Sequence, residues 1–221
     1  MANEDEASGT ARVGGGAGTG RGAATSRGAA TRRRILEVAS DLFSEHGIHE
    51  VSADRIIEAV GVTKVTFYRH FRTKEDLVVA YLQERATIET DAFEGAYVEA
   101  AGDAMRTFDM LAVGIGAQSC RPGFRGCPFI NAAAEYADPA SPVRRVVDEH
   151  RAWMVSFFRR VLVDAGVDRL DEATDAAVVL RDGAMVSGYL TDAKAVEGTL
   201  HTMFHALVAT YAAGEERVGR R

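Results

Sequence analysis

Residues 51–77 read VSADRIIEAVGVTKVTFYRHFRTKEDL, and this stretch decides the fold. Its pattern predicts one helix that begins after Ser52 and ends at Gly61, followed by a short second helix that begins after Thr63. Such a pair sets its second helix forward, where the N-terminal residues can enter the major groove of DNA. Residues 63–72 contain no Asp or Glu, but they are rich in side chains that bond phosphates and base edges. The stretch therefore indicates a helix-turn-helix that binds DNA.

Helical periodicity continues on both sides of this stretch. Upstream, apolar residues between Ile35 and Phe43 recur at i, i+3, i+4 and i+7, and Gly47 ends that helix. Downstream, Thr73 caps a helix that runs to about Glu99. Five more helices are expected, at about 104–119, from Pro128 onward, and at about 142–165, 171–192 and 195–213. Because no alternating strand pattern appears, we predict an all-α fold with nine helices.

The composition fits a globular protein with one unusually basic segment. The chain has 221 residues, of which 47% are apolar, so it is long enough to bury a core. Its net charge of −6 is uneven, because residues 21–74 carry ten basic and six acidic side chains, whereas residues 75–221 carry 15 basic and 23 acidic ones. This asymmetry favours a polyanionic partner for the basic segment, although chance clustering on solvated faces gives the same pattern.

Several protein classes are disfavoured by what the sequence lacks. The Gly- and Ala-rich residues 1–27 cannot bury a core, so we expect a flexible tail there. Neither an apolar run of membrane-spanning length nor a signal-peptide pattern occurs, so we expect a cytoplasmic protein with no membrane partner. No nucleophile-elbow, zinc-protease or phosphate-loop motif is present, so we expect no enzymatic activity and no cofactor.

Three motifs inside the deciding stretch carry a family resemblance: Gly61-Val62-Thr63-Lys64, Thr66-Phe67-Tyr68-Arg69-His70-Phe71 and Lys74-Glu75-Asp76-Leu77. With the helices expected before them, they resemble the TetR family of transcriptional repressors over about residues 31–80, although Val65 stands where that family usually has a small residue. The resemblance implies a nine-helix architecture, with a DNA-binding domain at 28–88 and a ligand-binding and dimerisation domain at 89–221. It also implies a repressor that binds a palindromic operator in double-stranded DNA as a homodimer and is released by a small, mostly apolar effector.

The resemblance assigns DNA contacts residue by residue. The residues implied to face the DNA or to bond its phosphates are Ser52, Thr63, Lys64, Thr66, Tyr68, His70 and Lys74. Some of them have a purely structural alternative, because Ser52 and Thr63 are needed as helix caps and His70 can simply pack against the next helix. Phe67 and Phe71 are expected in the core.

Two further sites are implied for the second domain. Met and aromatic side chains line adaptable apolar pockets, so a set of such residues in this domain suits a ligand cavity. The alternative for each of them is ordinary packing in the core. The expected lining is Met105, Phe108, Gln118, Cys127, Asn131, Trp153, Phe157, Met185 and Tyr189, with Glu135 as a further polar anchor. The last two helices are expected to pair across a two-fold axis through Leu180, Ala184, Leu200, Phe204, Leu207 and Tyr211.

Cysteine and histidine pairs leave two questions open. Cys120 and Cys127 are separated by six residues, and they are either inert thiols or the switch of a redox- or electrophile-sensing regulator, which is the alternative function. His201 and His205 share one helix face at i, i+4. Because no third ligand is recognisable nearby in the sequence, we expect no metal site.

Overall fold

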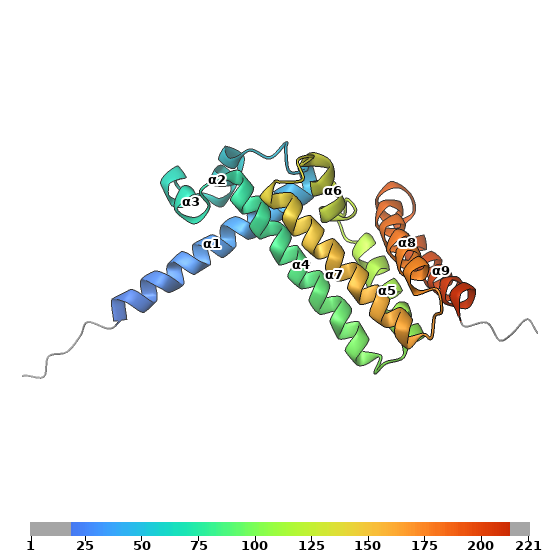
Figure 1. Ribbon diagram of the computed structural model, residues 1–221. Helices are drawn as coiled ribbons and strands as arrows, with labels where there is room; N and C mark the ends of the chain where they lie inside the picture. Colours follow the sequence, from blue (N-terminus) through green and yellow to red (C-terminus); the bar gives the residue numbers. More distant parts are fainter. Residues whose placement is uncertain (1–18, 213–221) are drawn as a thin grey trace, which may run out of the picture.

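The computed structural model of the protein describes residues 19–212, with side chains described for residues 27–212, and these residues form an all-α fold (Figure 1). The described part contains no strand, only an isolated bridge between Val167 and Ala212. Nine α-helices and one 3-10 helix follow in the order α1 (Thr19–His46), α2 (Ala53–Val60), α3 (Lys64–His70), α4 (Lys74–Glu99), α5 (Ala104–Ser119), α6 (Pro128–Glu135), α7 (Pro142–Asp164), α8 (Leu170–Leu190), η1 (Ala193–Ala195) and α9 (Val196–Tyr211).

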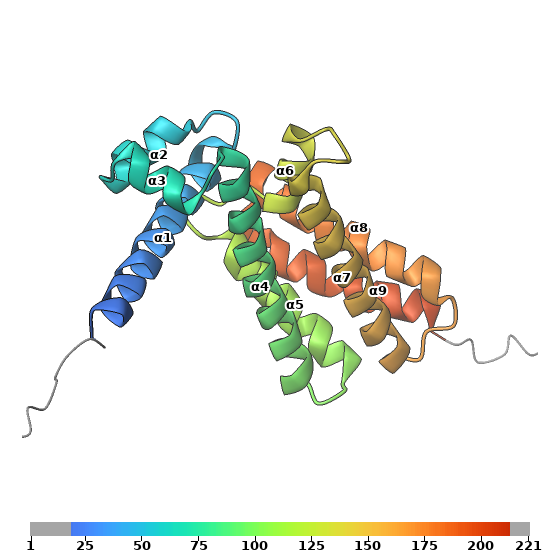
Figure 2. The same cartoon turned by 60° about the vertical axis from the view of Figure 1, so that its left-hand side comes forward.

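The helices form two groups joined by α4. At one end, α2 and α3 lie close to α1 and to the start of α4, while the first turns of α1 project away from the rest of the molecule (Figures 1 and 2). At the other end, α4 and α7 run side by side, and α8 and α9 pack against each other and against α5 (Figure 1). The helix α4 therefore extends continuously from the first group into the second.

Local capping explains why the helices near α3 begin and end where they do. Ser52, Thr63 and Thr73 each accept a hydrogen bond from a backbone amide in the first turn of the helix that follows, as expected from the sequence. Thr73 and Asp76 complete a capping box at the start of α4. Gly61 ends α2 with φ 71°, a left-handed conformation that favours glycine. These caps fix the turn between α2 and α3.

The structure differs from the sequence-based expectations at two places. The helix α1 begins at Thr19, so part of the segment 1–27, expected to be a flexible tail, is helical; residues 1–18 lie outside the described residues. Alanine has the highest helix propensity, and 23–24 and 29–30 are Ala-Ala pairs that favour extending the helix in this direction. The 3-10 helix η1 between α8 and α9 was not expected.

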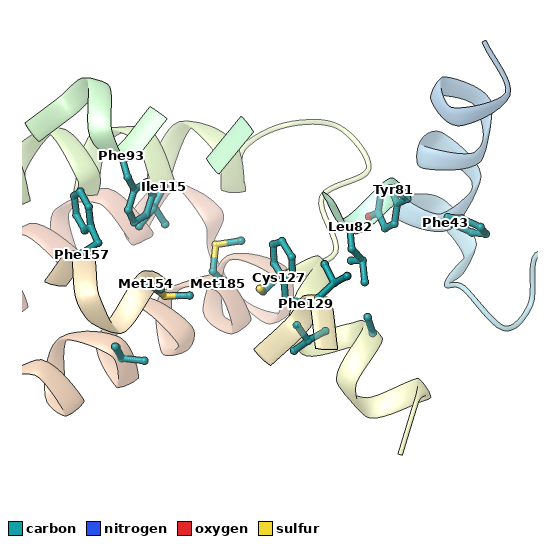
Figure 3. Packing of buried hydrophobic residues seen from close by; sticks show 14 of the residues in the cluster. Phe43, Tyr81, Leu82, Phe93, Ile115, Cys127, Phe129, Met154, Phe157 and Met185 are labelled. Atoms are coloured by element: carbon teal, nitrogen blue, oxygen red, sulfur yellow. The ribbon is translucent and has the colours of Figure 1, made fainter. Parts of the chain in front are cut away.

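One continuous core joins the two groups of helices (Figure 3). The Phe43 ring of α1 meets the Tyr81 ring of α4 edge to face, with centroids 5.5 Å apart, and this contact anchors the N-terminal group. Farther along α4, Phe93 packs against Phe157 of α7 at 5.3 Å. The division into domains at 28–88 and 89–221 remains a prediction, and α4 crosses its boundary. None of the described helices is both long and apolar enough to cross a membrane.

Candidate DNA-binding interface and effector cavity

The short helix α3 has one buried and one exposed face. Phe67 is completely buried and Phe71, just after the helix, nearly so, which confirms both as core residues. On the opposite face, Val65 is 79% exposed and Tyr68 is 44% exposed, and Lys64 is also exposed. Large side chains that remain exposed on a firmly anchored helix are available to a partner surface. This face therefore presents Lys64 and Tyr68, two of the residues that the sequence assigned to DNA.

Lys64 is held by a neighbouring carboxylate rather than pointing freely into solvent. Its Nζ lies 2.9 Å from Oδ1 of Asp54 on α2, and this hydrogen bond and the charge of Asp54 raise the pKa of Lys64 above its usual value. A phosphate that binds Lys64 must therefore compete with Asp54. Beside it, Thr63 accepts a hydrogen bond from the Thr66 amide at 3.1 Å, and the two hydroxyls are 3.0 Å apart.

The remaining expected DNA contacts have structural partners of their own. The Ser52 hydroxyl accepts from the Arg55 amide at 3.2 Å, and Lys74 Nζ donates to the carbonyl of His49 at 3.3 Å. Burial lowers the pKa of Lys74, while the nearby Glu135 carboxylate opposes that shift. Both side chains thus support the backbone around the helix-turn-helix, whatever further contact they make.

His70, at the end of α3, lies half-buried. Its Nε2 is enclosed and has no hydrogen-bond partner among the described residues, so this atom is not open to a phosphate in this conformation. Burial, with the charges of Arg69 and Arg32, lowers the pKa of His70 below its usual value. The structure therefore agrees with the packing alternative at least as well as with a phosphate contact.

A cavity of about 500 Å³ lies where the N-terminal helices meet the rest of the molecule. One wall comes from the end of α1 and the turn after it, between residues 40 and 48, and from Tyr81 of α4. The facing wall comes from the loop of residues 121–126, from Asn131 of α6 and from Tyr189 of α8. All four residues expected as polar anchors line this cavity: Gln118, Asn131, Glu135 and Tyr189.

The cavity lining carries charge. Arg85, Arg121 and Arg125 line it together with two carboxylates, those of Asp41 and Glu135. Serines, Gln and Asn add neutral hydrogen-bonding groups. The lining is therefore more polar than the mostly apolar pocket expected from the sequence.

Contacts across this cavity tie the two groups of helices together. The Glu135 carboxylate accepts hydrogen bonds from the backbone amides of Ile48 at 3.1 Å and His49 at 2.5 Å, in the turn that leads to α2. Arg125 Nη1 donates to the carbonyl of Glu45 near the end of α1 at 2.7 Å. Because these bonds end on backbone atoms, a change at Glu135 or Arg125 acts directly on the position of α1 and α2.

The apolar residues expected to line a pocket lie elsewhere. Phe108, Phe157, Met185 and Cys127 are buried in the core, and no cavity described here includes them, Met105 or Trp153. The Phe108 ring, for example, lies 4.5 Å from that of Phe204. Periodicity identifies an apolar face but does not say whether a neighbouring side chain or an empty space meets it.

The expected dimer residues on α8 and α9 fall into two sets that differ in burial. Leu200, Phe204 and Leu207 are buried within their own chain, which leaves them little surface for a partner, and their place in an intermolecular contact stays a prediction. Leu180, Ala184 and Tyr211 are only partly buried. A groove of about 430 Å³ between α8 and α9 is lined in part by Leu180, Ala184, Leu200 and the exposed side chains Val179 and Met203.

A buried charged cluster was not expected from the sequence. Arg181 of α8 is 1% exposed, and its guanidinium pairs with Glu89 of α4 and with Asp182, while His150 Nε2 lies 3.4 Å from Glu89. Burial opposes the ionisation of Glu89, but Arg181 and His150 outweigh it and hold the pKa of Glu89 below its usual value. The signal that was overlooked is an arginine on an otherwise apolar face of α8.

The two cysteines lie in different environments. Cys127 is buried and its Sγ accepts a hydrogen bond from Arg181 at 3.1 Å, whereas Cys120 is exposed. A switch built from both thiols is therefore not favoured.

Known proteins resemble the chain in both sequence and structure. A family model described as bacterial regulatory proteins of the tetR family matches residues 35–81. The crystal structure of a TetR-family transcriptional regulator from Streptomyces coelicolor is 36% identical, with a TM-score of 0.80, over 84% of this chain and 97% of that one. A TetR-family regulator from Agrobacterium tumefaciens has a TM-score of 0.72, over 84% of this chain and 100% of that one, but at 17% identity it supports the fold alone.

A further relative matches over a much shorter stretch. An HTH-type transcriptional regulator of Staphylococcus aureus (strain USA300) is 42% identical over 52 residues, which are 24% of this chain and 28% of that protein. The residues matched by the family model include α3 and its exposed face, and the likeness to the Streptomyces protein extends over nearly all of that chain. The chain belongs to the TetR family of DNA-binding transcriptional regulators.

Proposed function

We propose that this protein is a homodimeric repressor whose operator affinity falls when a small, polar, anionic molecule occupies the cavity between α1 and α6. The observation that carries the proposal is the composition of that cavity. Its walls come from the group of helices that includes α1 and α3 and from the second group of helices alike. A molecule bound there touches both, so its binding energy acts directly on their relative position.

The charge of the lining argues for an anion. Three arginines and two carboxylates line the cavity, and one of the carboxylates, Glu135, already accepts two backbone hydrogen bonds. Arginine recognises carboxylate and phosphate groups through paired hydrogen bonds. Although residues 75–221 have a net negative charge, these local arginines reverse it at the site.

Release from DNA follows from competition for the same groups. An anion that binds Arg125 competes with the carbonyl of Glu45, and one placed near Glu135 repels the carboxylate that holds the turn at 48–49. The start of α4, which follows α3 directly, then shifts with that turn. A difference of about 1–3 kcal/mol in effector affinity between the two states is enough to weaken DNA binding about 5–150-fold.

Homodimer formation and a palindromic operator belong to the same proposal. Two copies of α3 reading one face of DNA require half-sites about 34 Å apart, one helical turn, or a little more where the DNA is distorted. The basic residues of the segment 21–74 support binding to phosphates, which fixes orientation on the duplex but carries little base information.

The test of the DNA-binding part uses the DNA upstream of the protein's own gene. Wild type should bind a near-palindrome there and reduce transcription from that promoter in vitro. The double variant Lys64→Ala/Tyr68→Ala should bind more weakly across sequences, whereas changes at Thr66 should alter sequence preference. Unchanged operator affinity in a folded double variant, measured by fluorescence anisotropy, would contradict the proposed interface.

The test of the effector cavity needs no known ligand. Ala134 is an exposed residue of α6 that lines the cavity, so Ala134→Trp should fill part of it and reduce operator affinity as an effector does. Ala117→Trp, at an exposed position on α5 that is not part of the cavity lining, is the control and should leave the affinity unchanged. Equal affinities of the two variants and wild type would argue against this cavity as the regulatory site.

A further inference from the structure

Three metal-binding side chains meet on the surface between α5 and α9. His201 and His205 lie one turn apart on α9, with their rings stacked at a centroid distance of 4.3 Å. Asp109 of α5 faces both of them: its Oδ1 lies 3.2 Å from Nε2 of His201 and 2.8 Å from Nε2 of His205. One donor atom from each of the three residues lies within 4.8 Å of the other two. The third ligand that the sequence did not reveal is thus supplied by a residue 92 positions before His201.

We propose that Asp109, His201 and His205 bind one divalent transition-metal ion of the zinc class within a single chain. Two imidazoles and one carboxylate form a donor set that zinc accepts, and tetrahedral bonds of about 2.0–2.1 Å put neighbouring ligand atoms about 3.3 Å apart. The measured separations of 3.2 and 2.8 Å from Asp109 need only a small adjustment to reach that value.

The helix packing underneath holds these ligands in place. The Phe108 and Phe204 rings, from the residues directly before Asp109 and His205, are in contact at 4.5 Å. Farther along, Gly116 and Glu197 approach so closely that a Cβ on Gly116 would lie 2.6 Å from the Cβ of Glu197. Since the two helices are packed together at the site and beyond one end of it, binding requires little rearrangement of the backbone.

The site also has an access route. The three side chains are between 41% and 50% exposed, so an ion reaches them from solvent and water can complete the coordination. An ion held by both helices clamps α9 onto α5. A metal that binds the folded chain but not the unfolded chain adds its binding free energy to the stability of the fold. We therefore expect the ion to stabilise the second group of helices.

The test uses zinc ions with untagged, chelator-treated full-length protein that carries Cys120→Ser, so that the exposed thiol does not bind the metal. Calorimetric titration should give one site per chain, and zinc should raise the midpoint of thermal unfolding. His205→Ala and Asp109→Asn should each weaken zinc binding more than about tenfold, because even groups that only support metal ligands change affinity by about 10–100-fold.

The matched control is His49→Ala, which removes an exposed histidine beside a carboxylate, Glu135 at 3.4 Å, outside this three-residue group. It should leave zinc affinity unchanged. The proposal is overturned if wild type binds no zinc, or if His205→Ala and Asp109→Asn bind it as tightly as wild type. It is also overturned if light scattering shows that zinc binds only by bridging separate copies of the protein.

Discussion

At the scale of single residues, the pairing of Lys64 with Asp54 bears on the proposed DNA interface, because a phosphate must compete with Asp54 for Lys64. Asp54→Asn removes a negative charge beside that proposed interface and frees Lys64, whose Nζ lies 2.9 Å from the carboxylate. Exposed pairs of this kind contribute little, so we expect affinity for DNA of any sequence to rise by about fivefold at most.

Fluorescence anisotropy with operator and unrelated DNA measures this effect at two salt concentrations. Glu58→Gln, which also neutralises an exposed acid on α2, is the control for general charge and should have the smaller effect. Weaker binding by a folded Asp54→Asn protein would show that Asp54 supports the interface instead of competing with it.

A second residue links the same helix to pH. Burial and the nearby charges of Arg69 and Arg32 lower the pKa of His70 from its ordinary 6.5. As the pH falls below about 6.5, the unfolded chain takes up a proton on this residue before the folded chain does, so the free energy of unfolding decreases until the folded pKa is reached.

Urea unfolding of wild type and His70→Gln at pH 7.5 and 5.5 separates this contribution from the rest. Between pH 7.5 and 5.5, the free energy of unfolding of wild type should decrease relative to that of His70→Gln. One proton accounts for at most about 1.4 kcal/mol per pH unit. A difference that is the same at both pH values would mean that His70 titrates alike in the folded and unfolded chains.

At the scale of helices, the sequence predicts what is encoded locally. Ser52, Thr63 and Thr73 cap the helices that follow them, and Gly61 ends α2, because each of these effects depends on a few adjacent residues. The role of Phe204 was not predictable in this way. The apolar residues of α9 share a period whether they meet α5 of the same chain or another molecule, and only the fold assigns Phe204 to the core.

The packing of α5 against α9 gives a sharp test at this scale. A Cβ on Gly116 would lie 2.6 Å from Cβ and 3.1 Å from Cα of Glu197, so Gly116→Ala forces the two helices apart. Overpacking of this kind costs about 1–3 kcal/mol. Two residues earlier on the same helix, Gly114 has nothing within 4 Å of an added Cβ.

Gly114→Ala is therefore the matched control, and it should stabilise the protein by about 0.5–1 kcal/mol through helix propensity alone. Chemical denaturation of both variants compares them directly. Equal stability changes of the same sign would contradict the close approach of α5 and α9.

At the scale of the whole molecule, the candidate sites are assembled from segments that are far apart in the chain. The polar anchors Gln118, Asn131 and Tyr189 were recognised from the sequence, but the α1 wall of their cavity, near Ser44, was not. Likewise, Asp109 meets His205 only because α5 packs against α9. Contacts of this kind depend on tertiary packing. A pattern along the chain therefore predicts which residues take part in a site better than it predicts which of them come together.

Assembly is the last property that belongs to this scale. Val179 is 66% exposed and lines the groove between α8 and α9, where a second copy would cover it in the proposed homodimer. Val179→Glu places one charge from each copy in that contact. An obligate interface commonly buries about 2,000 Å² or more, and burying unpaired charges there is costly. We therefore expect Val179→Glu to yield folded monomers. Val163→Glu, at a 56% exposed position on α7, should remain dimeric.

Light scattering at micromolar concentration, with circular dichroism to confirm folding, measures these outcomes. Phe204→Glu should behave differently from Val179→Glu and lose its fold, because Phe204 is completely buried against Phe108 of its own chain. If wild type is a monomer, or if Val179→Glu forms a dimer as stable as that of wild type, α8 and α9 do not form a dimer interface. Since the two substitutions differ in whether the native side chain faces its own core or solvent, their contrast separates an interface defect from a folding defect.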